Sequence, residues 1–231
     1  MIDFHTHTLP GIDDGSESIG ESLKMISTLK DSGIRRICLT PHFYAHRDDP
    51  AHFISRRDEA YEALLGALGE CDVSLHKGAE VAYYSGVSRM RELDEMRIDG
   101  TSLLLLEMPN EPFSDYTLSE LIELSSSSRK TLVLAHVERF IGYQRRSVIY
   151  TLKERGVLMQ INASVLLDPK TSKRACKLLK DGTFDLIGSD CHGSSFRPPR
   201  IGEAHELVRL KLGDRWFEGY KHFTESLFSR V

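Results

Sequence analysis

Two histidines close to the N-terminus have a spacing that suits metal binding. They stand two positions apart in His5-Thr-His7, and residues i and i+2 of a strand point to the same side. Both imidazoles could therefore face one ion, whereas an isolated pair of histidines is more often a packed or surface feature. An acidic turn with Asp13 and Asp14 follows between two glycines, and taken alone it would be a solvated turn.

Charged or imidazole side chains recur where apolar runs of the sequence end, and this repetition carries more weight than any single motif. The residues concerned are His42, Glu80, Glu107, His136, Asp190 and His192. A carboxylate at the end of a buried strand needs a partner, because taking an unpaired charge out of water is costly. Metal ions would satisfy all of these side chains together.

Five histidines and four carboxylates form the set of candidate metal ligands: His5, His7, Asp14, His42, Glu80, Glu107, His136, Asp190 and His192. Nine ligands are too many for one ion and suit two or three divalent ions. Nitrogen and oxygen ligands without thiolate favour manganese, iron or zinc over copper(I), calcium or magnesium. Three such ions against four carboxylates leave a surplus of positive charge, which would favour a phosphate dianion.

Two arginines lie close in sequence to candidate ligands, and we predict catalytic roles for both. Arg139 follows His136, and Arg197 follows His192. The planar guanidinium group binds two phosphate oxygens at once and would stabilise charge that develops on a reacting phosphoryl group.

A competing motif surrounds Cys191, which precedes Arg197 with the C-x5-R spacing of cysteine-dependent phosphatases. The match is superficial, because the usual glycine three residues after the cysteine is Ser194 here. Pro198 and Pro199 would also hinder a helix that continues from the loop. A thiolate mechanism therefore remains an alternative that a Cys191→Ser variant would test.

Short apolar strands followed by amphipathic helices must position these residues, and this alternation predicts a parallel sheet. The expected strands after the N-terminal one are residues 35–41, 73–81, 102–107, 131–136, 157–162 and 184–190. Polar residues end the units at intervals of 26 to 38 residues, close to one strand plus its crossover. An open doubly wound sheet shares this pattern, but about seven units favour a (β/α)7 barrel with the site at the C-terminal ends of the strands. Ser18 and Thr117 each begin a capping-box pattern, so we expect helices to start there.

Composition limits the class of protein. The chain has 231 residues, 40% of them hydrophobic, which is enough for one core, and we expect a single domain over residues 1–231. A net charge of −4 disfavours nucleic acid as a partner. The longest apolar runs are far too short for a transmembrane segment, and the N-terminus does not resemble a signal peptide, so we expect a cytoplasmic protein. The four cysteines are widely spaced and fit reduced thiols.

Several motifs together resemble the PHP (polymerase and histidinol phosphatase) superfamily. They are MIDFHTHTLPGIDDGS at the start, TPH at 40–42, GAEV at 78–81, AHVERF at 135–140 and SDCH followed by RPP at 189–199. Within the superfamily, the chain is most similar to the bacterial capsular-polysaccharide protein-tyrosine phosphatases of the CpsB/CapC type. The motifs keep the family order from residue 1 to about residue 205.

This resemblance implies a distorted seven-unit TIM-like barrel with a trinuclear centre, for which manganese is favoured and iron or zinc are alternatives. His5, His7, Glu80 and Asp190 would hold the first ion, and Glu80 would bridge to a second held by Glu107 and His136. Asp14, His42 and His192 would hold the third, and Arg139 and Arg197 would contact the substrate phosphate.

By the same resemblance, the activity is hydrolysis of phosphotyrosine on proteins, without a covalent phospho-enzyme. The expected substrate is a bacterial tyrosine autokinase that controls capsule or exopolysaccharide synthesis. Four aromatic residues near strand ends could line a slot for the phosphotyrosine ring: Phe43, Tyr44, Phe113 and Phe140. Phe43–His52 and Met108–Tyr116 are the segments that match the family least, and they leave substrate selection open.

Three other functions remain open from the sequence. A small-molecule phosphatase related to histidinol phosphatase would use the same metal site. A non-catalytic phosphotyrosine-binding regulator would bind a phosphopeptide and release no phosphate. A phosphodiesterase or nuclease is disfavoured by the acidic balance of the chain.

Overall fold

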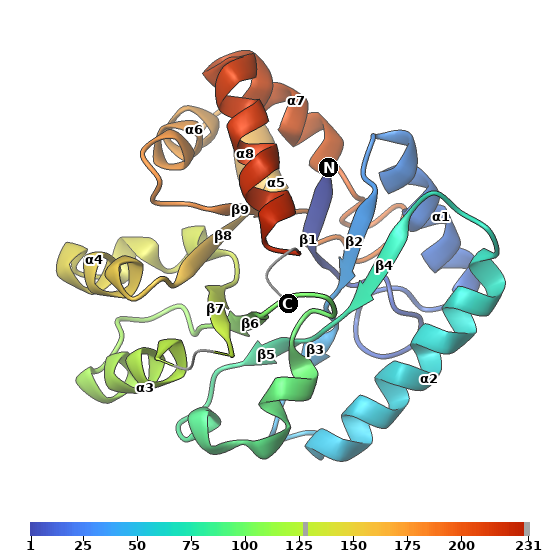
Figure 1. Ribbon diagram of the computed structural model, residues 1–231, viewed down its shortest axis with the longest axis horizontal. Helices are drawn as coiled ribbons and strands as arrows, with labels where there is room; N and C mark the ends of the chain where they lie inside the picture. The colour runs from blue at the N-terminus through green and yellow to red at the C-terminus, as the bar shows by residue number, and fades with distance from the viewer. Residues whose placement is uncertain (127–128, 229–231) are drawn as a thin grey trace.

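The computed structural model describes residues 1–126 and 129–228, and its centre is a curled sheet of parallel strands (Figure 1). The strands are β1 (Ile2–Thr6), β2 (Arg36–Leu39), β3 (His42–Phe43), β4 (Ser74–Lys77), β5 (Glu80–Ala82), β6 (Leu103–Glu107), β7 (Thr131–Leu134), β8 (Leu158–Asn162) and β9 (Leu186–Gly188). They pair in the orders β1-β2-β4 and β3-β5-β6-β7-β8-β9. Every expected strand segment therefore contains a strand, and the pairing is parallel throughout.

Two of the expected strands are interrupted. The expected strand over residues 35–41 ends as β2 at Leu39, and β3 begins only after Pro41, which has no N–H for the ladder. The expected strand over residues 73–81 divides into β4 and β5, with Gly78 and Ala79 between them. The backbone N–H of Gly78 still donates to the carbonyl of Leu39 at 2.8 Å, and that of Glu80 donates to Pro41 at 2.9 Å. The broken strands therefore continue side by side, and the polar residues after each break stay at the C-terminal edge.

The curl of the sheet brings its first and last strands together. The backbone N–H of Asp190 donates to the carbonyl of His5 at 2.8 Å, and that of His7 donates to Cys191 at 3.0 Å. A side chain at Gly188 would collide with His5, because an added Cβ would lie 2.6 Å from the His5 Cβ. Glycine at this position therefore lets β9 approach the strand that carries the histidine pair.

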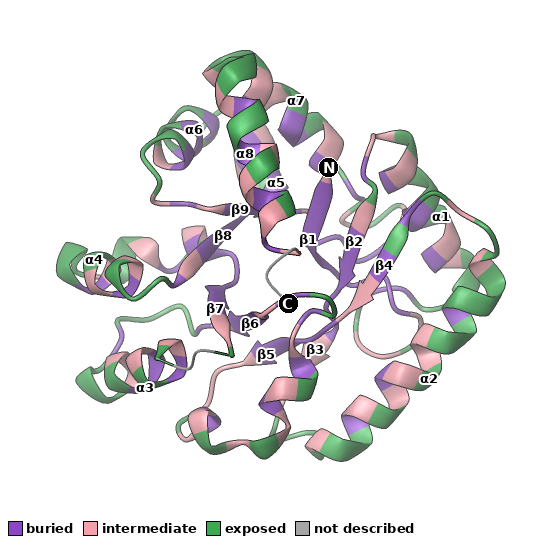
Figure 2. Ribbon diagram, in the orientation of Figure 1, coloured by how far each residue is buried: buried purple, intermediate pink, exposed green. Residues whose placement is uncertain are grey.

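Helices surround the outside of the sheet in Figure 1. They are α1 (Ile19–Asp31), α2 (Pro50–Leu68), α3 (Asp115–Ser125), α4 (Arg146–Glu154), α5 (Ala163–Leu167), α6 (Ser172–Lys180), α7 (Ile201–Leu212) and α8 (Asp214–Ser226). Figure 2 shows their exposed residues facing outward while the strands are mostly buried. Within the described residues, no helix is both long and apolar enough to cross a membrane.

Helix starts agree with the sequence in one case and differ in another. Ser18 caps α1, and its hydroxyl accepts the N–H of Glu21 at 3.3 Å. The expected start of a helix at Thr117 is wrong, because Ser114 caps α3 by accepting the N–H of Thr117 at 3.0 Å. The Glu120 of that expected capping box is instead buried and bonds to a neighbouring loop.

The apolar strands have two buried faces, as parallel sheets covered by helices do. On β6, Leu104 and Leu106 pack in the core beneath the helices. Leu103 and Leu105 point to the other face and belong to a second cluster with Phe4 and the C-terminal Leu227. This second cluster covers the inner face of the curled sheet, below the edge that carries the candidate ligands.

Candidate metal centre

The histidine pair at the end of β1 converges with two carboxylates from other segments, Glu80 at the start of β5 and Asp190 just after β9. Nε2 of His5 and Nε2 of His7 lie 3.1 Å apart. Oε2 of Glu80 lies 3.1 Å from Nε2 of His5 and 3.4 Å from Nε2 of His7. Oδ1 of Asp190 lies 3.6 Å from Nε2 of His5 and 3.3 Å from Nε2 of His7. Four ligand atoms arranged tetrahedrally at about 2.1 Å from an ion would be roughly 3.4 Å apart. The separations in this group therefore fit one bound ion.

A second group forms around the same glutamate. Nε2 of His136 lies 2.8 Å from Oε1 of Glu80 and 3.3 Å from Oε1 of Glu107. Nδ1 of His42 approaches Oε2 of Glu80 at 2.9 Å and Oε2 of Glu107 at 3.8 Å. Because both oxygens of Glu80 face candidate ligands, this residue lies between the first and second groups.

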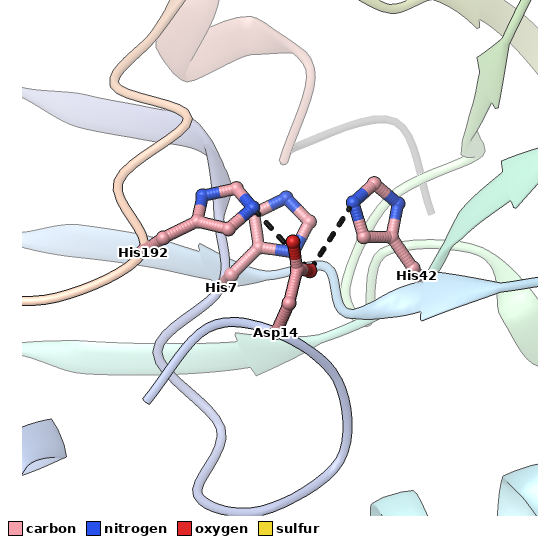
Figure 3. Close-up of side chains that lie close together, drawn as sticks. All are labelled: His7, Asp14, His42 and His192. Carbon is pink, nitrogen blue, oxygen red and sulfur yellow. Dashed lines mark ion pairs between the residues drawn. The ribbon is translucent and has the colours of Figure 1, made fainter. Parts of the chain in front are cut away.

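The third group stands at the open side of the site, and Figure 3 shows Asp14 between two imidazoles. Oδ1 of Asp14 lies 3.6 Å from Nε2 of His42 and 3.6 Å from Nε2 of His192. His7 lies behind them, with its ring stacked on that of His192 at a centroid distance of 3.9 Å. His42 thus faces the second group through Nδ1 and the third group through Nε2. The family resemblance of the sequence places His42 in the third group alone.

All nine predicted ligands therefore gather at one end of the sheet, and their chemistry fits divalent cations. Glu80 is completely buried, and neither its Oε2 nor Nδ1 of His42 has a hydrogen-bond partner among the described residues. Buried polar atoms without partners are rare, because they lose their hydration without compensation. Two atoms of this kind facing each other among carboxylates and imidazoles are what an ion would satisfy.

Oxygen atoms behind two of the candidate ligands lie within hydrogen-bond distance of their outward-facing Nδ1 atoms. Nδ1 of His5 lies 3.1 Å from Oε1 of Gln160, and Nδ1 of His192 lies 3.0 Å from the backbone oxygen of Asp190. When Nδ1 donates its proton outward in this way, Nε2 carries the lone pair that a metal needs. Asn162 adds a bond to the back of Asp190, with its Nδ2 donating to Oδ2 at 2.7 Å.

Gln160 and Asn162 were missed in the sequence because an amide in a buried strand carries no pattern of its own. Asp13 was noticed only as part of the acidic turn. Its Oδ2 accepts from Nδ1 of His7 at 2.6 Å, so it orients a candidate ligand from behind. Gly15 allows the turn to reach this position, because an added Cβ would lie 2.2 Å from the backbone oxygen of His7.

Electrostatics in the site couple its acids and bases. Burial alone would disfavour protonated His136, but hydrogen bonds to Glu107 and Glu80 outweigh it and raise the His136 pKa to about 9. Burial alone would raise the pKa of Glu80, but the charge of His5 and hydrogen bonds from neighbouring histidines hold that pKa well below its usual value. A proton on His136 therefore offsets part of the carboxylate charge in the protein alone, and bound cations would replace it.

Backbone strain is concentrated at this site. Among the described residues other than glycine, positive φ angles occur at His136 (32°), Asp190 (52°) and Arg197 (50°). Such conformations cost about 1–3 kcal/mol each and persist where surrounding structure enforces them. All three belong to the predicted site, so the fold uses strained backbone to direct these side chains.

Comparison with known proteins identifies the family. The family model described as "Capsular polysaccharide synthesis, CpsB/CapC" matches residues 1–221. The chain belongs to the CpsB/CapC family. Tyrosine-protein phosphatase YwqE of Bacillus subtilis is 26% identical over 92% of this chain and 85% of its own length. Putative tyrosine-protein phosphatase CapC of Staphylococcus aureus is 26% identical over 95% and 88%.

The fold is shared with solved structures of relatives. One chain from a crystallographic study of YwqE from Bacillus subtilis and CpsB from Streptococcus pneumoniae, described as "unique metal-dependent tyrosine phosphatases", aligns with a TM-score of 0.83. The alignment covers 99% of this chain and 94% of that chain at 24% identity. This likeness confirms a mixed α/β fold around a curled parallel sheet for this CpsB/CapC protein.

Both predicted arginines reach the candidate metal ligands of this CpsB/CapC chain. A terminal nitrogen of Arg139 donates to Oδ2 of Asp190 at 3.0 Å, and Arg197 donates to the same oxygen. The second terminal nitrogen of Arg197 lies 3.0 Å from Nε2 of His192. The two side chains are 37% and 36% exposed, so their guanidinium groups border the site while remaining open to an incoming anion.

The thiolate alternative does not fit the structure of this family member. Cys191 is completely buried, and burial raises the pKa of its thiol to about 12. A nucleophilic cysteine needs an accessible thiolate, which electropositive surroundings normally stabilise. Its Sγ lies 4.0 Å from Oγ1 of Thr8, which leaves it a packed residue beneath the site.

The expected aromatic slot is only partly correct. Phe43 and Phe140 are completely buried, and Phe113 is 8% exposed, so all three belong to the hydrophobic core. Phe43 packs against Phe53 of α2 at a ring-centroid distance of 5.1 Å, and Phe113 packs against Phe140 at 5.3 Å. Tyr44 is the only one of the four expected aromatics that borders a cavity beside the metal centre.

Proposed function

We propose that this protein is a metal-dependent phosphatase that hydrolyses phosphotyrosine on proteins. The observation that carries the proposal is the convergence of nine imidazole and carboxylate side chains with two guanidinium groups at their edge. No nucleophilic side chain of the thiolate kind is available there, since Cys191 is buried. The names of the relatives supply the tyrosine specificity.

Two or three divalent ions would occupy the site, with manganese favoured. One ion would be held by His5, His7, Glu80 and Asp190. A second would be held by Glu80, Glu107 and His136, and a third by Asp14, His42 and His192. His42 could also bind the second ion. When bound, such ions lower the pKa of coordinated water and polarise phosphoryl oxygens.

The chain's own residues would bind and orient the substrate. Arg139 and Arg197 present planar donors at the partly exposed edge of the site, where they would hold phosphate oxygens and stabilise charge in the transition state. Gln160, Asn162 and Asp13 keep the ligand side chains in place before substrate arrives. This preorganisation is what allows fixed charges to lower a reaction barrier.

The wider setting follows from the family. We propose that residues 1–231 act as one domain, with β2–β3 and β4–β5 counted as two broken strands of a seven-unit barrel. The substrate would be the phosphotyrosine segment of a bacterial tyrosine autokinase in capsule or exopolysaccharide synthesis. The family description, capsular polysaccharide synthesis, supports this assignment.

Elemental analysis of the purified protein, paired with hydrolysis of p-nitrophenyl phosphate, tests the proposal. We expect two or three equivalents of manganese, iron or zinc, loss of activity on chelation and recovery on adding manganese. Activity that persists in metal-free protein would contradict the metal mechanism.

Kinetics on defined substrates then separates the remaining functions. A higher kcat/KM for a phosphotyrosyl peptide than for histidinol phosphate is expected, and the reverse order would identify a small-molecule phosphatase. Tight binding of the peptide without phosphate release would identify a non-catalytic regulator.

A further inference from the structure

A cavity of about 560 Å³ opens beside the metal centre, next to Glu107. Three segments that follow neighbouring strands line it, namely residues 44–46 after β3, 82–84 at the end of β5 and 107–110 after β6. Its size is typical of sites for small organic groups. Because Glu107 belongs both to this lining and to the candidate ligands, the cavity and the metal centre adjoin.

Tyr44 forms one wall of the cavity, and two neighbouring side chains contact its ring. The ring centroid lies 5.1 Å from that of His42, and the guanidinium carbon of Arg47 lies over the ring at 4.7 Å. The backbone oxygen of Tyr44 accepts from the N–H of Arg47 at 2.9 Å and of Asp48 at 3.1 Å. These contacts fix the position of the Tyr44 ring in the wall of the cavity.

Tyr83 and Tyr84 also line the cavity, and a buried glutamate fixes their loop. The hydroxyl of Tyr83 donates to Oε2 of Glu120 at 2.9 Å, while Oε1 accepts from the backbone of Gly86 at 2.8 Å. Glu120 is only 4% exposed, so these bonds are shielded from water. Met108 is buried in the same lining and adds a polarisable apolar surface.

Other hollows beside the metal centre are built differently. The one next to Asp14 is lined by charged groups that include Arg47, Asp48 and Arg56. The one next to Asp190 is lined by Arg197, Arg200 and polar side chains such as Ser164. Among these three hollows, the cavity beside Glu107 is the one whose walls suit an aromatic ring.

We infer that this cavity is the subsite for the aromatic ring of the substrate, and that Tyr44 determines specificity for aryl over alkyl phosphates. The inference rests on the proposed function, because it takes the phosphate to lie at the metal centre. A terminal nitrogen of Arg139 lies 3.6 Å from Oε1 of Glu107, so a phosphate held by Arg139 would stand at the mouth of the cavity. The ring attached to it would then stack against Tyr44 and Tyr84, as aromatic pairs do.

Binding of two phosphonates to the manganese-loaded protein tests this subsite without relying on turnover. Phenylphosphonate and methylphosphonate carry the same anion but differ in the ring, and calorimetry gives both affinities. We expect Tyr44→Ala to weaken phenylphosphonate about tenfold, equivalent to about 1.4 kcal/mol, and to change methylphosphonate less than twofold. Tyr44→Phe should retain the wild-type preference, because stacking needs the ring and not the hydroxyl.

Two further variants keep the test independent of local unfolding. Tyr84→Ala alters the cavity from another lining residue and should also reduce the preference for phenylphosphonate. Tyr150→Ala removes a tyrosine that is 64% exposed on α4, and it should leave both affinities unchanged. Thermal unfolding of each variant reports whether the fold is intact.

An equal loss of both phosphonates in Tyr44→Ala would overturn the inference, because Tyr44 would then shape the metal centre. Unchanged preference in both Tyr44→Ala and Tyr84→Ala would overturn it as well. If the wild-type protein cleaves a phosphotyrosyl peptide but neither alanine variant alters the phosphonate ratio, the subsite fails and the proposed function stands. If the ratio responds as expected but no phosphate is released from the peptide, the subsite stands and the proposed function fails.

Discussion

Oδ2 of Asp13 accepts a hydrogen bond from Nδ1 of His7 at a distance of 2.6 Å. The same oxygen accepts the backbone N–H of His42 at 2.8 Å. Burial alone would raise the pKa of Asp13, but the hydrogen bond and charge of His7 outweigh it and lower that pKa to about 2. One carboxylate that faces away from the metal centre therefore positions two of its candidate ligands.

Replacement of Asp13 should weaken metal binding although its carboxylate lies behind the ligands. We expect Asp13→Asn to lower the affinity for manganese about 10- to 100-fold, because the charge that orients His7 is lost. Competition with a chelator measures this affinity. The matched control is Asp31→Asn, the same change at an exposed position at the end of α1. Equal affinities in wild-type and Asp13→Asn protein would show that the His7 ring is oriented by other contacts.

Gln160 should matter for both stability and metal binding. Its Oε1 lies 3.1 Å from Nδ1 of His5 and accepts the backbone N–H of His136 at 2.8 Å. Gln160→Leu leaves that buried N–H without a partner, so the free energy of unfolding should fall by about 2 kcal/mol. Gln160→Glu keeps both acceptor functions and should retain more metal affinity than the leucine variant. Denaturant unfolding and chelator competition give the two quantities, and a leucine variant equal to wild type in both would contradict this role.

The two arginines should act on turnover more than on folding. We expect Arg139→Ala and Arg197→Ala each to lower kcat/KM for p-nitrophenyl phosphate by about 100-fold, since each removes a donor for phosphoryl oxygens. Lysine at either position should restore activity only in part, because it lacks the planar pair of donors. Arg209→Ala is the control, because Arg209 pairs with Glu206 on α7 and lines none of the three hollows beside the site. If Arg139→Ala and Arg197→Ala instead bind less metal but keep their activity once fully loaded, the arginines support the metal ligands and not the substrate.

Cys191 should be dispensable for chemistry. Because its thiol is buried and its pKa is raised to about 12, almost no thiolate exists at neutral pH. We expect Cys191→Ser and Cys191→Ala to keep phosphatase activity within about threefold once they are loaded with metal. Loss of activity in both variants with normal metal content and normal thermal stability would revive a thiol mechanism.

His205 on α7 should make the protein less stable in acid. It is 1% exposed, its two ring nitrogens have no hydrogen-bond partners among the described residues, and its ring lies against Phe217 and Tyr220. Burial, together with the positive charge of the N-terminus, lowers the His205 pKa to about 3. The unfolded chain therefore binds a proton that the folded chain rejects between about pH 6.5 and 3, so stability falls as pH falls through this window.

The size of this effect follows from the linkage between protonation and folding. From pH 7 to pH 5, His205 should cost wild-type protein about 2 kcal/mol of unfolding free energy, and His205→Phe should remove that loss. His222→Phe, the same change at an exposed histidine, should leave the pH dependence unaltered. Denaturant unfolding at the two pH values measures the difference, and parallel curves for wild type and His205→Phe would exclude the effect.

The gathering of the nine candidate ligands is the part of the site that the sequence alone could predict. His5, Glu80, His136 and Asp190 each stand at the end of an apolar run, and parallel strands place such ends at one edge. The spacing of His5 and His7 in an extended segment likewise predicts that both rings face the same side. These predictions need only local periodicity and the common direction of the strands.

The partners behind the ligands were decided by tertiary structure. Gln160 meets His5 across 155 residues of sequence because the curl of the sheet brings their strands together. Nothing in the residue type distinguishes this buried amide from one that merely fills a strand. The separate roles of Asp13 and Asp14 also depend on the path of the turn over His7, which Gly15 permits.

The same distinction holds for the aromatic residues and the strand breaks. Phe43 and Tyr44 are neighbours in the sequence, but alternation along the chain sends Phe43 into the core and Tyr44 to the cavity. Pro41 in the sequence could have indicated the interruption between β2 and β3, whereas the continuation of the ladder beyond it is visible only in the hydrogen bonds. Local pattern thus determines which residues reach the site, and long-range packing determines what each of them contacts, because contacts between distant segments leave no local periodicity.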